Sequence, residues 1–162
     1  MRTSRWIGLF LVIVAGVGLL AADSLRSRTT AAEQAPASAA ASKFQPVDDS
    51  MHEFMEYQFQ PTYLRLKAAM AKPPTDRAGW KPIKADSMIL AEGGNLLLIR
   101  TPAKGGAEWN KWSIAVRTRG GQLYRAAKKQ DYPSAQTHYR AMLTSCNACH
   151  KAFAKGKHQL KP

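Results

Sequence analysis

Several features are missing from this chain of 162 residues, and each absence excludes a class of protein. No cysteine lies directly after the apolar N-terminal run, so a lipoprotein anchor is excluded. There is no paired carboxylate motif, no nucleophile signature and no glycine-rich phosphate loop after a strand, and we therefore expect no enzyme activity. Lys and Arg number 24 against 11 Asp and Glu, a net charge of +13, but they form no dense basic run with interleaved aromatics. We therefore expect no nucleic-acid binding.

The first 42 residues are expected to direct export of the protein and to link or tether it, rather than to fold. Two arginines precede an apolar run that ends at Leu20, as in a secretory signal. Residues 1–22 are therefore predicted to be a signal peptide, or an uncleaved N-terminal membrane anchor, because the uncharged span is close to the lower limit for a membrane helix. Residues 23–42 are rich in Ala and Ser, which predicts a disordered linker. The predicted location is periplasmic or otherwise extracytoplasmic, with a membrane tether as the open alternative.

Residues 43–162 are predicted to form an all-α domain. Apolar residues recur at helical spacing in four segments, which loops containing proline or glycine separate. The predicted helices run from a cap at Asp48, Asp49 or Ser50 to Pro73, from Thr75 or Asp76 to about Arg100, from about Glu108 to Lys129, and from Asp131 to about Phe153. Pro61 lies inside the first helix and should kink or split it. Residues 155–162 are expected to be a polar tail.

Two glycine pairs interrupt the middle helices. Gly93-Gly94 and Gly120-Gly121 each weaken a helix, by about 1 kcal/mol per glycine relative to alanine. We favour close packing between helices as the reason for the first pair, and room for the flat edge of a cofactor is the alternative. Trp109 and Trp112, one turn apart, are expected to lie in the core, where they could also border a cofactor.

The most specific pattern is Cys146-Asn147-Ala148-Cys149-His150, on the last predicted helix. Two cysteines separated by two residues and followed by histidine is the pattern by which haem is attached covalently. On a helix the two sulfurs lie about one turn apart, where each can form a thioether with one haem vinyl group. The neighbouring imidazole can then bind the iron. We therefore predict one covalent haem c, with Cys146 and Cys149 as attachment sites and His150 as the proximal iron ligand.

Other interpretations of the two cysteines stay open. A thioredoxin-like redox pair needs a preceding strand, and no strand-like run precedes Cys146. A zinc site needs four ligands. Beyond the two cysteines, the chain could supply only its four histidines, His52, His138, His150 and His158. A further interpretation is an exported helical interaction module, in which Cys146 and Cys149 form a local disulfide and no haem binds.

Four helices with this motif near the end of the last one resemble the class II c-type cytochromes, the cytochrome c′ and low-spin cytochrome c-556-like family. The resemblance covers about residues 44–155. It implies an antiparallel four-helix bundle with covalently bound haem c on the last helix, and it assigns Cys146, Cys149 and His150 the roles given above. It also implies that two copies of the chain can dimerise through their first two helices.

In that family a residue of the first helix covers the opposite face of the haem. The candidates in this chain are Met51, His52 and Met55, of which Met55 lies on the apolar face of the predicted helix and ranks ahead of His52. A ligand there implies an exported monohaem cytochrome that transfers electrons and docks on an acidic redox partner. The alternative is cytochrome c′-type binding of small gases, NO or CO, at a five-coordinate haem, with Phe54 or Phe59 screening the open position.

Overall fold

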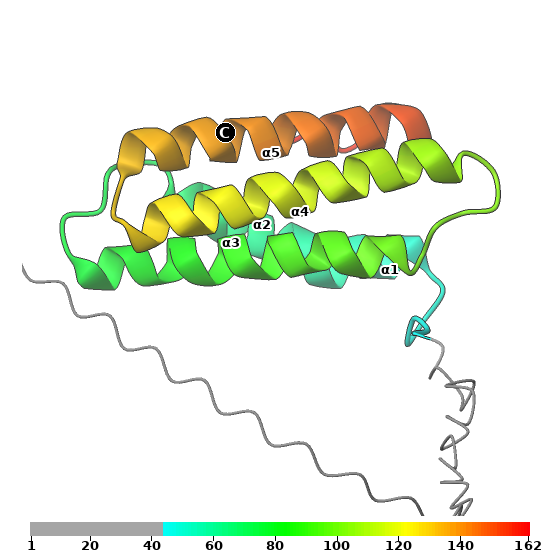
Figure 1. Cartoon of the computed structure of the whole chain (residues 1–162), viewed down its shortest axis with the longest axis horizontal. Coiled ribbons are helices and arrows are strands. Elements are labelled where there is room, and N and C mark those ends of the chain that lie inside the picture. The colour runs from blue at the N-terminus through cyan, green and yellow to red at the C-terminus, as the bar shows by residue number, and fades with distance from the viewer. Residues whose placement is uncertain (1–43) are drawn as a thin grey trace, which may run out of the picture. The chain divides into compact units, whose positions relative to one another are not determined.

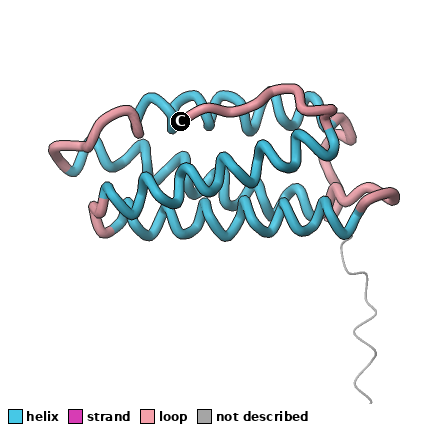
Figure 2. Tube along the Cα trace, turned by 90° about the horizontal axis from the view of Figure 1, so that it is seen from above, coloured by secondary structure: helices cyan, strands magenta, loops and turns pink. Residues whose placement is uncertain are grey.

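The computed structural model describes residues 44–162, in which every regular element is a helix (Figure 1). Its elements are α1 (Met51–Phe54), η1 (Met55–Phe59), α2 (Gln60–Ala69), α3 (Arg77–Leu98), α4 (Gly106–Lys128) and α5 (Tyr132–Phe153). Because α1, η1 and α2 follow one another without a break, they form one first helical stretch beside three long helices (Figure 2). The predicted all-α class is thus confirmed for residues 44–162.

The N-terminal predictions fall on a part of the chain outside this region. The signal peptide or anchor at 1–22 and the linker at 23–42 lie outside the described residues, and so both stay predictions. Within residues 44–162, none of the helices combines the length and the apolar character that a membrane crossing requires.

Short polar side chains fix three of the helix starts where the sequence predicts them. Ser50 accepts a hydrogen bond from the Glu53 N–H, Asp76 from the Gly79 N–H, and Asp131 from the Ser134 N–H. Each cap satisfies a backbone donor that has no partner within its helix. The observed end of α3 and the observed start of α4 each lie two residues before the predicted ones, and the first helical stretch ends at Ala69, four residues before Pro73.

Pro61 splits the first helical stretch, as its missing N–H leads one to expect. The five residues of η1 wind as a π-helix, and the N–H of Gln60 reaches back to the carbonyl of Met55. Pro61 consequently lies in the first turn of α2, where a missing N–H leaves no hydrogen bond unmade. The chain therefore accommodates the proline by adding a residue to one turn.

The core lies between the first helical stretch and the three long helices. Its buried apolar residues are Leu66, Met70, Trp80, Ile83, Leu90, Val116, Leu123, Ala126, Ala127, Ala135, Tyr139, Met142 and Leu143. α3 packs on α2 and on α4, and α4 packs on α5, whereas no Cα atom of the first stretch comes within 8 Å of a Cα atom of α5. The backbones are therefore close together in the pairs α2–α3, α3–α4 and α4–α5, whereas those of the first helical stretch and α5 stay apart.

Glycines of α3 and α4 make room for two different neighbours, the facing long helix and the ring of Phe59. A Cβ added at Gly94 would lie 2.8 Å from the backbone nitrogen of Arg117, and one at Gly120 would lie 3.1 Å from the Cα of Ala91. These two glycines therefore permit the close packing of α3 against α4 that the sequence led us to favour. A Cβ at Gly93 would instead lie 2.7 Å from the ring of Phe59, on the first helical stretch.

Replacing Gly94 by alanine should destabilise the protein by about 1–3 kcal/mol, because the new methyl group meets backbone atoms that cannot move aside. Gly121→Ala is the matched control. Its added Cβ meets only the end of the Arg125 side chain, at 3.5 Å, so this change should stabilise the helix by up to about 1 kcal/mol. Urea unfolding of both variants measures the difference, and equal stabilities would contradict the packing role of Gly94.

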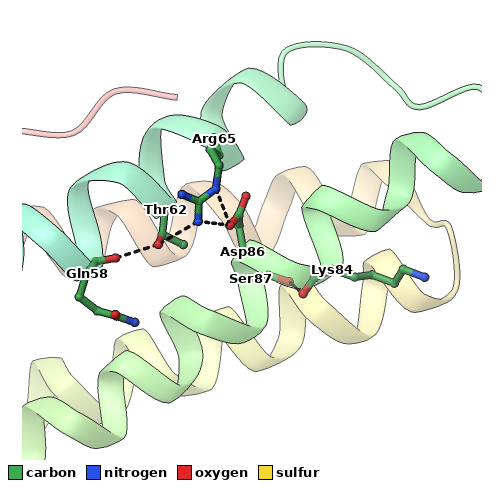
Figure 3. Close-up of polar contacts among 6 residues, drawn as sticks. All are labelled: Gln58, Thr62, Arg65, Lys84, Asp86 and Ser87. Atoms are coloured by element: carbon green, nitrogen blue, oxygen red, sulfur yellow. Dashed lines mark hydrogen bonds and ion pairs between the residues drawn. The ribbon is translucent and has the colours of Figure 1, made fainter.

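A buried carboxylate ties α2 to α3 (Figure 3). Arg65 donates from Nε and Nη2 to Oδ1 of Asp86, at 3.1 and 2.7 Å. The Arg65 guanidinium also donates to Thr62 Oγ1, which in turn donates to the carbonyl of Gln58. The Asp86 side chain is 4 % exposed and that of Arg65 is 54 % exposed. The half-exposed guanidinium of Arg65 therefore neutralises the buried carboxylate of Asp86.

Arg65→Ala should lower the free energy of unfolding by about 2 kcal/mol, because it leaves the Asp86 carboxylate buried without its partner. The half-exposed position of Arg65 lets water replace part of the interaction, which keeps the loss below that of a fully buried pair. A double-mutant cycle with Asp86→Ala, followed by urea unfolding, isolates the interaction. The double variant should regain part of the loss, and strictly additive losses would contradict this account.

Candidate functional site

A cavity of ≈ 630 Å³ lies where the first helical stretch and α5 stay apart. This volume falls within the range of about 300–1,000 Å³ that is usual for small-molecule sites. Figure 1 shows the start of the first stretch and the end of α5 at the same end of the molecule. The cavity is lined by Met51, His52, Met55, Glu56, Phe59, Gln60, Tyr63, Leu64, Leu90, Leu97, Trp112, Val116, Met142, Leu143, Cys146, Cys149, His150, Ala154, His158, Gln159 and Leu160.

The α5 wall of the cavity carries all three residues of the predicted attachment motif. Cys146, Cys149 and His150 line it together, as residues three or four apart on one helix can. Cys149 is buried in a small apolar cluster with Leu97 and Trp109, and Cys146 packs against the main core. Both cysteines are free thiols. The structure therefore presents two sulfurs and an imidazole to one apolar space.

Burial keeps both thiols protonated. It raises the pKa of Cys146 to about 12, with a smaller contribution from the neighbouring Cys149. It raises the pKa of Cys149 to about 11, with a smaller contribution from the Glu108 carboxylate. A thiolate nucleophile needs a lowered pKa, so these sites do not favour redox or nucleophilic chemistry of the cysteines themselves.

The three candidates for the distal ligand lie on the opposite wall and differ in burial and in contacts. Met51 and Met55 are partly buried and pack against the cluster that contains Cys149. His52 also borders the cavity, but its side chain is 81 % exposed and its Nε2 lies 3.2 Å from Oε2 of Glu56. The geometry therefore favours a methionine over His52 on this wall.

Aromatic side chains from the first helical stretch and from α4 border the same space. Trp109 is buried, and its Nε1 donates to the carbonyl of Leu97 at 2.7 Å, so it belongs to the core. Trp112 is only partly buried and lines the cavity, as does Phe59 of the π-helix. Gly93 makes room for the Phe59 ring, and one glycine of the first pair thus shapes the cavity indirectly. Phe54, the other aromatic candidate, does not line it.

The C-terminal tail is the part of the site that sequence patterns missed. Residues 155–162 were expected to be a polar tail, yet His158, Gln159 and Leu160 line the cavity, and Leu160 packs against the core. The Nδ1 of His150 lies 2.8 Å from the carbonyl oxygen of His158. The side chain of His158 is exposed, so the contact depends on the backbone. The one available signal was Leu160, a large apolar residue in an otherwise polar segment.

The residues present fit a large, flat, mostly apolar group that is attached through sulfur. The walls are apolar, two thiols stand one turn apart, and an imidazole follows.

The alternative interpretations of the motif find less support in the described region. Residues 44–162 contain no strand, so the setting of a thioredoxin-like pair is missing there. Among the same residues, no three His, Cys, Asp or Glu side chains gather closely enough to hold a bare metal ion. His138 lies outside the cavity lining, and His52 and His158 are both exposed.

Comparison with known families and with curated proteins found no match to this chain. The resemblance to class II cytochromes therefore depends on the motif, on its position and on the helical fold. We accordingly infer the function from the residues that line the cavity.

The raised thiol pKa values predict slow alkylation of the chain before any group is attached. At about pH 8 iodoacetamide should label the folded chain far more slowly than the urea-unfolded chain, because an unperturbed thiol titrates near 8.5. Labelling of the folded chain should keep accelerating up to about pH 11 at Cys149 and about pH 12 at Cys146. Peptide mass spectrometry separates the two sites.

The same shifts make the folded chain sensitive to alkali. In the folded state the thiols keep protons that they lose in the unfolded state, so they contribute to the free energy of unfolding fully below the unfolded pKa. This contribution is lost as the pH rises toward the folded pKa values.

In the labelling experiment, rates of the folded chain that level off near pH 9 would show that the thiols are not buried in this way.

Proposed function

We propose that this protein is an exported monohaem c-type cytochrome that transfers electrons. One observation carries the proposal: a single apolar cavity gathers Cys146, Cys149 and His150 from α5 together with Met51 and Met55 from the first helical stretch. The two methionines lie at least 91 positions before the cysteines and the histidine in the chain. Under this proposal the described helices are the antiparallel four-helix bundle of the class II cytochromes, with haem c on the last helix.

Each residue of the α5 wall has a separate role in holding the group. Cys146 and Cys149 would each hold the group by a thioether, formed when the S–H adds across a vinyl C=C bond, and His150 would bind the iron through Nε2. Haem supplies an iron that gains and loses one electron. The apolar side chains around it, among them Leu97 and Val116, exclude water and so help to set the energy of the charge change.

Met55 is the residue that would supply the second protein ligand of the haem iron. It lies in the π-turn forced by Pro61, is partly buried, and packs against the cluster that holds Cys149. Its uncharged thioether suits an apolar wall, whereas His52 is turned toward Glu56 and solvent. A methionine in this position fills the iron coordination and leaves no open site for a gas, which favours electron transfer over gas binding.

The surface charge indicates the kind of partner. The net charge of +13 favours transient docking on an acidic redox protein through long-range attraction. The location outside the cytoplasm follows from the predicted signal or anchor at residues 1–22. Dimerisation through the first two helices stays a prediction, and exposed apolar side chains on those helices could support it: Tyr57, Leu64, Met88 and Leu96.

The optical spectrum of the protein, matured in a strain that attaches haem c, tests this function. The wild-type protein should show low-spin bands in both oxidation states, and carbon monoxide should leave them unchanged. Met55→Ala should convert the bands to high spin and allow carbon monoxide to bind, because it removes the ligand without adding a replacement.

His52→Ala and Met51→Ala are the controls, and both should retain low-spin spectra. A high-spin wild-type protein that binds carbon monoxide would contradict electron transfer and support the gas-binding alternative. A colourless product would contradict both and favour the interaction module.

A further inference from the structure

The last eight residues do not leave the molecule but turn back along it. Three residues with positive φ reverse the chain after α5: Lys155 at 53°, Gly156 at 74° and His158 at 57°. The left-handed region is unfavourable for lysine and histidine, so contacts elsewhere must hold this path. Figure 2 shows the segment running back over the helices toward the C-terminus. We call residues 155–162 the C-terminal strap.

Two anchors hold the strap across the gap between the first stretch and α5. On the α5 side, Asn147 bonds both backbone groups of Leu160, accepting from its N–H at 2.7 Å and donating to its carbonyl at 3.0 Å. On the α2 side, the Tyr63 hydroxyl donates to the Lys161 carbonyl at 2.7 Å and accepts from its N–H at 3.1 Å. Lys67 also donates to that carbonyl, at 3.1 Å. The strap therefore joins two helices whose backbones do not touch.

The strap brings one carbonyl group onto the imidazole of the attachment motif. The carbonyl oxygen of His158 lies 2.8 Å from Nδ1 of His150. A carbonyl can only accept, so Nδ1 must carry the proton in this bond, and Nε2 of the neutral ring keeps its lone pair. A metal-binding histidine usually has such a partner for its other nitrogen, which fixes the ring orientation and raises its basicity.

We infer that the C-terminal strap is a positioning element for the iron ligand: through the His158 carbonyl it selects the tautomer of His150 that presents Nε2, and it strengthens that nitrogen as a donor. The inference deepens the proposed function and rests on it. Asn147, inside the attachment motif, and Tyr63, on the opposite helix, position His150 indirectly by holding the strap in place.

The tautomer of His150 tests the strap without any haem. In the full-length chain before haem attachment, nitrogen-15 NMR at alkaline pH, where imidazole is neutral, should show the proton on Nδ1. Deleting residues 158–162 should move it to Nε2, the form that an unpartnered imidazole favours in water. Tyr63→Phe keeps the whole chain and its packing and removes two strap bonds, so it should shift the population in the same direction by a smaller amount.

The midpoint potential tests the strap in the haem-loaded protein. Losing the bond to His158 makes His150 a weaker donor, which destabilises ferric iron more than ferrous iron. The potential should therefore rise on deletion of residues 158–162, and rise less in Tyr63→Phe. His158→Asn is the matched control, because asparagine tolerates positive φ and keeps the backbone carbonyl. Its potential should lie closer to that of the wild-type protein than to that of the truncated protein.

The two measurements separate failure of the strap from failure of the proposed function. An unmoved potential together with a proton that stays on Nδ1 in the truncated chain would overturn the strap. A shift in His158→Asn equal to that of the truncation would also overturn it, because the side chain would then carry the effect. A wild-type protein that acquires no covalent haem would overturn the proposed function, and the NMR result would still decide the role of the strap.

Discussion

The separation of the first helical stretch from α5 is the feature on which the rest of the structure depends. Helices that stay apart leave apolar side chains facing a space of ≈ 630 Å³. A group that covers those walls would remove apolar surface from water, worth about 25 cal/mol for each Å² covered. Binding an apolar group there would therefore contribute to the stability of the fold as well as to its function.

The remaining contacts keep this space in place. Gly94 and Gly120 let α3 and α4 pack closely, and the Arg65–Asp86 pair links α2 to α3 away from the cavity. The candidate ligands lie on the parts of the chain that this frame positions, the π-turn on one side and the last turns of α5 on the other. A frame that holds the candidate ligands in fixed positions suits an electron carrier, since a rigid site changes little between oxidation states.

Local sequence signals predicted the helices well, but they could not predict contacts between residues far apart in the chain. Ser50, Asp76 and Asp131 cap helices through neighbours three residues away, and Pro61 acts through its own missing N–H, so each effect can be predicted from a few adjacent residues. The inward position of Cys146, Cys149 and His150 followed from helical spacing. The docking of the strap depends on Asn147 meeting Leu160 and Tyr63 meeting Lys161, 98 positions away. No local pattern encodes such pairs.

The mass of the intact protein tests the central claim most directly. The protein is produced in a strain that matures c-type cytochromes, with a known c-type cytochrome as positive control, and is then unfolded and extracted with acidic acetone to remove any haem that is not covalently held. The account predicts that the wild-type chain keeps the mass of one haem and that a Cys146→Ala/Cys149→Ala variant keeps none. A wild-type chain without added mass, beside a control protein that carries its haem, would contradict it.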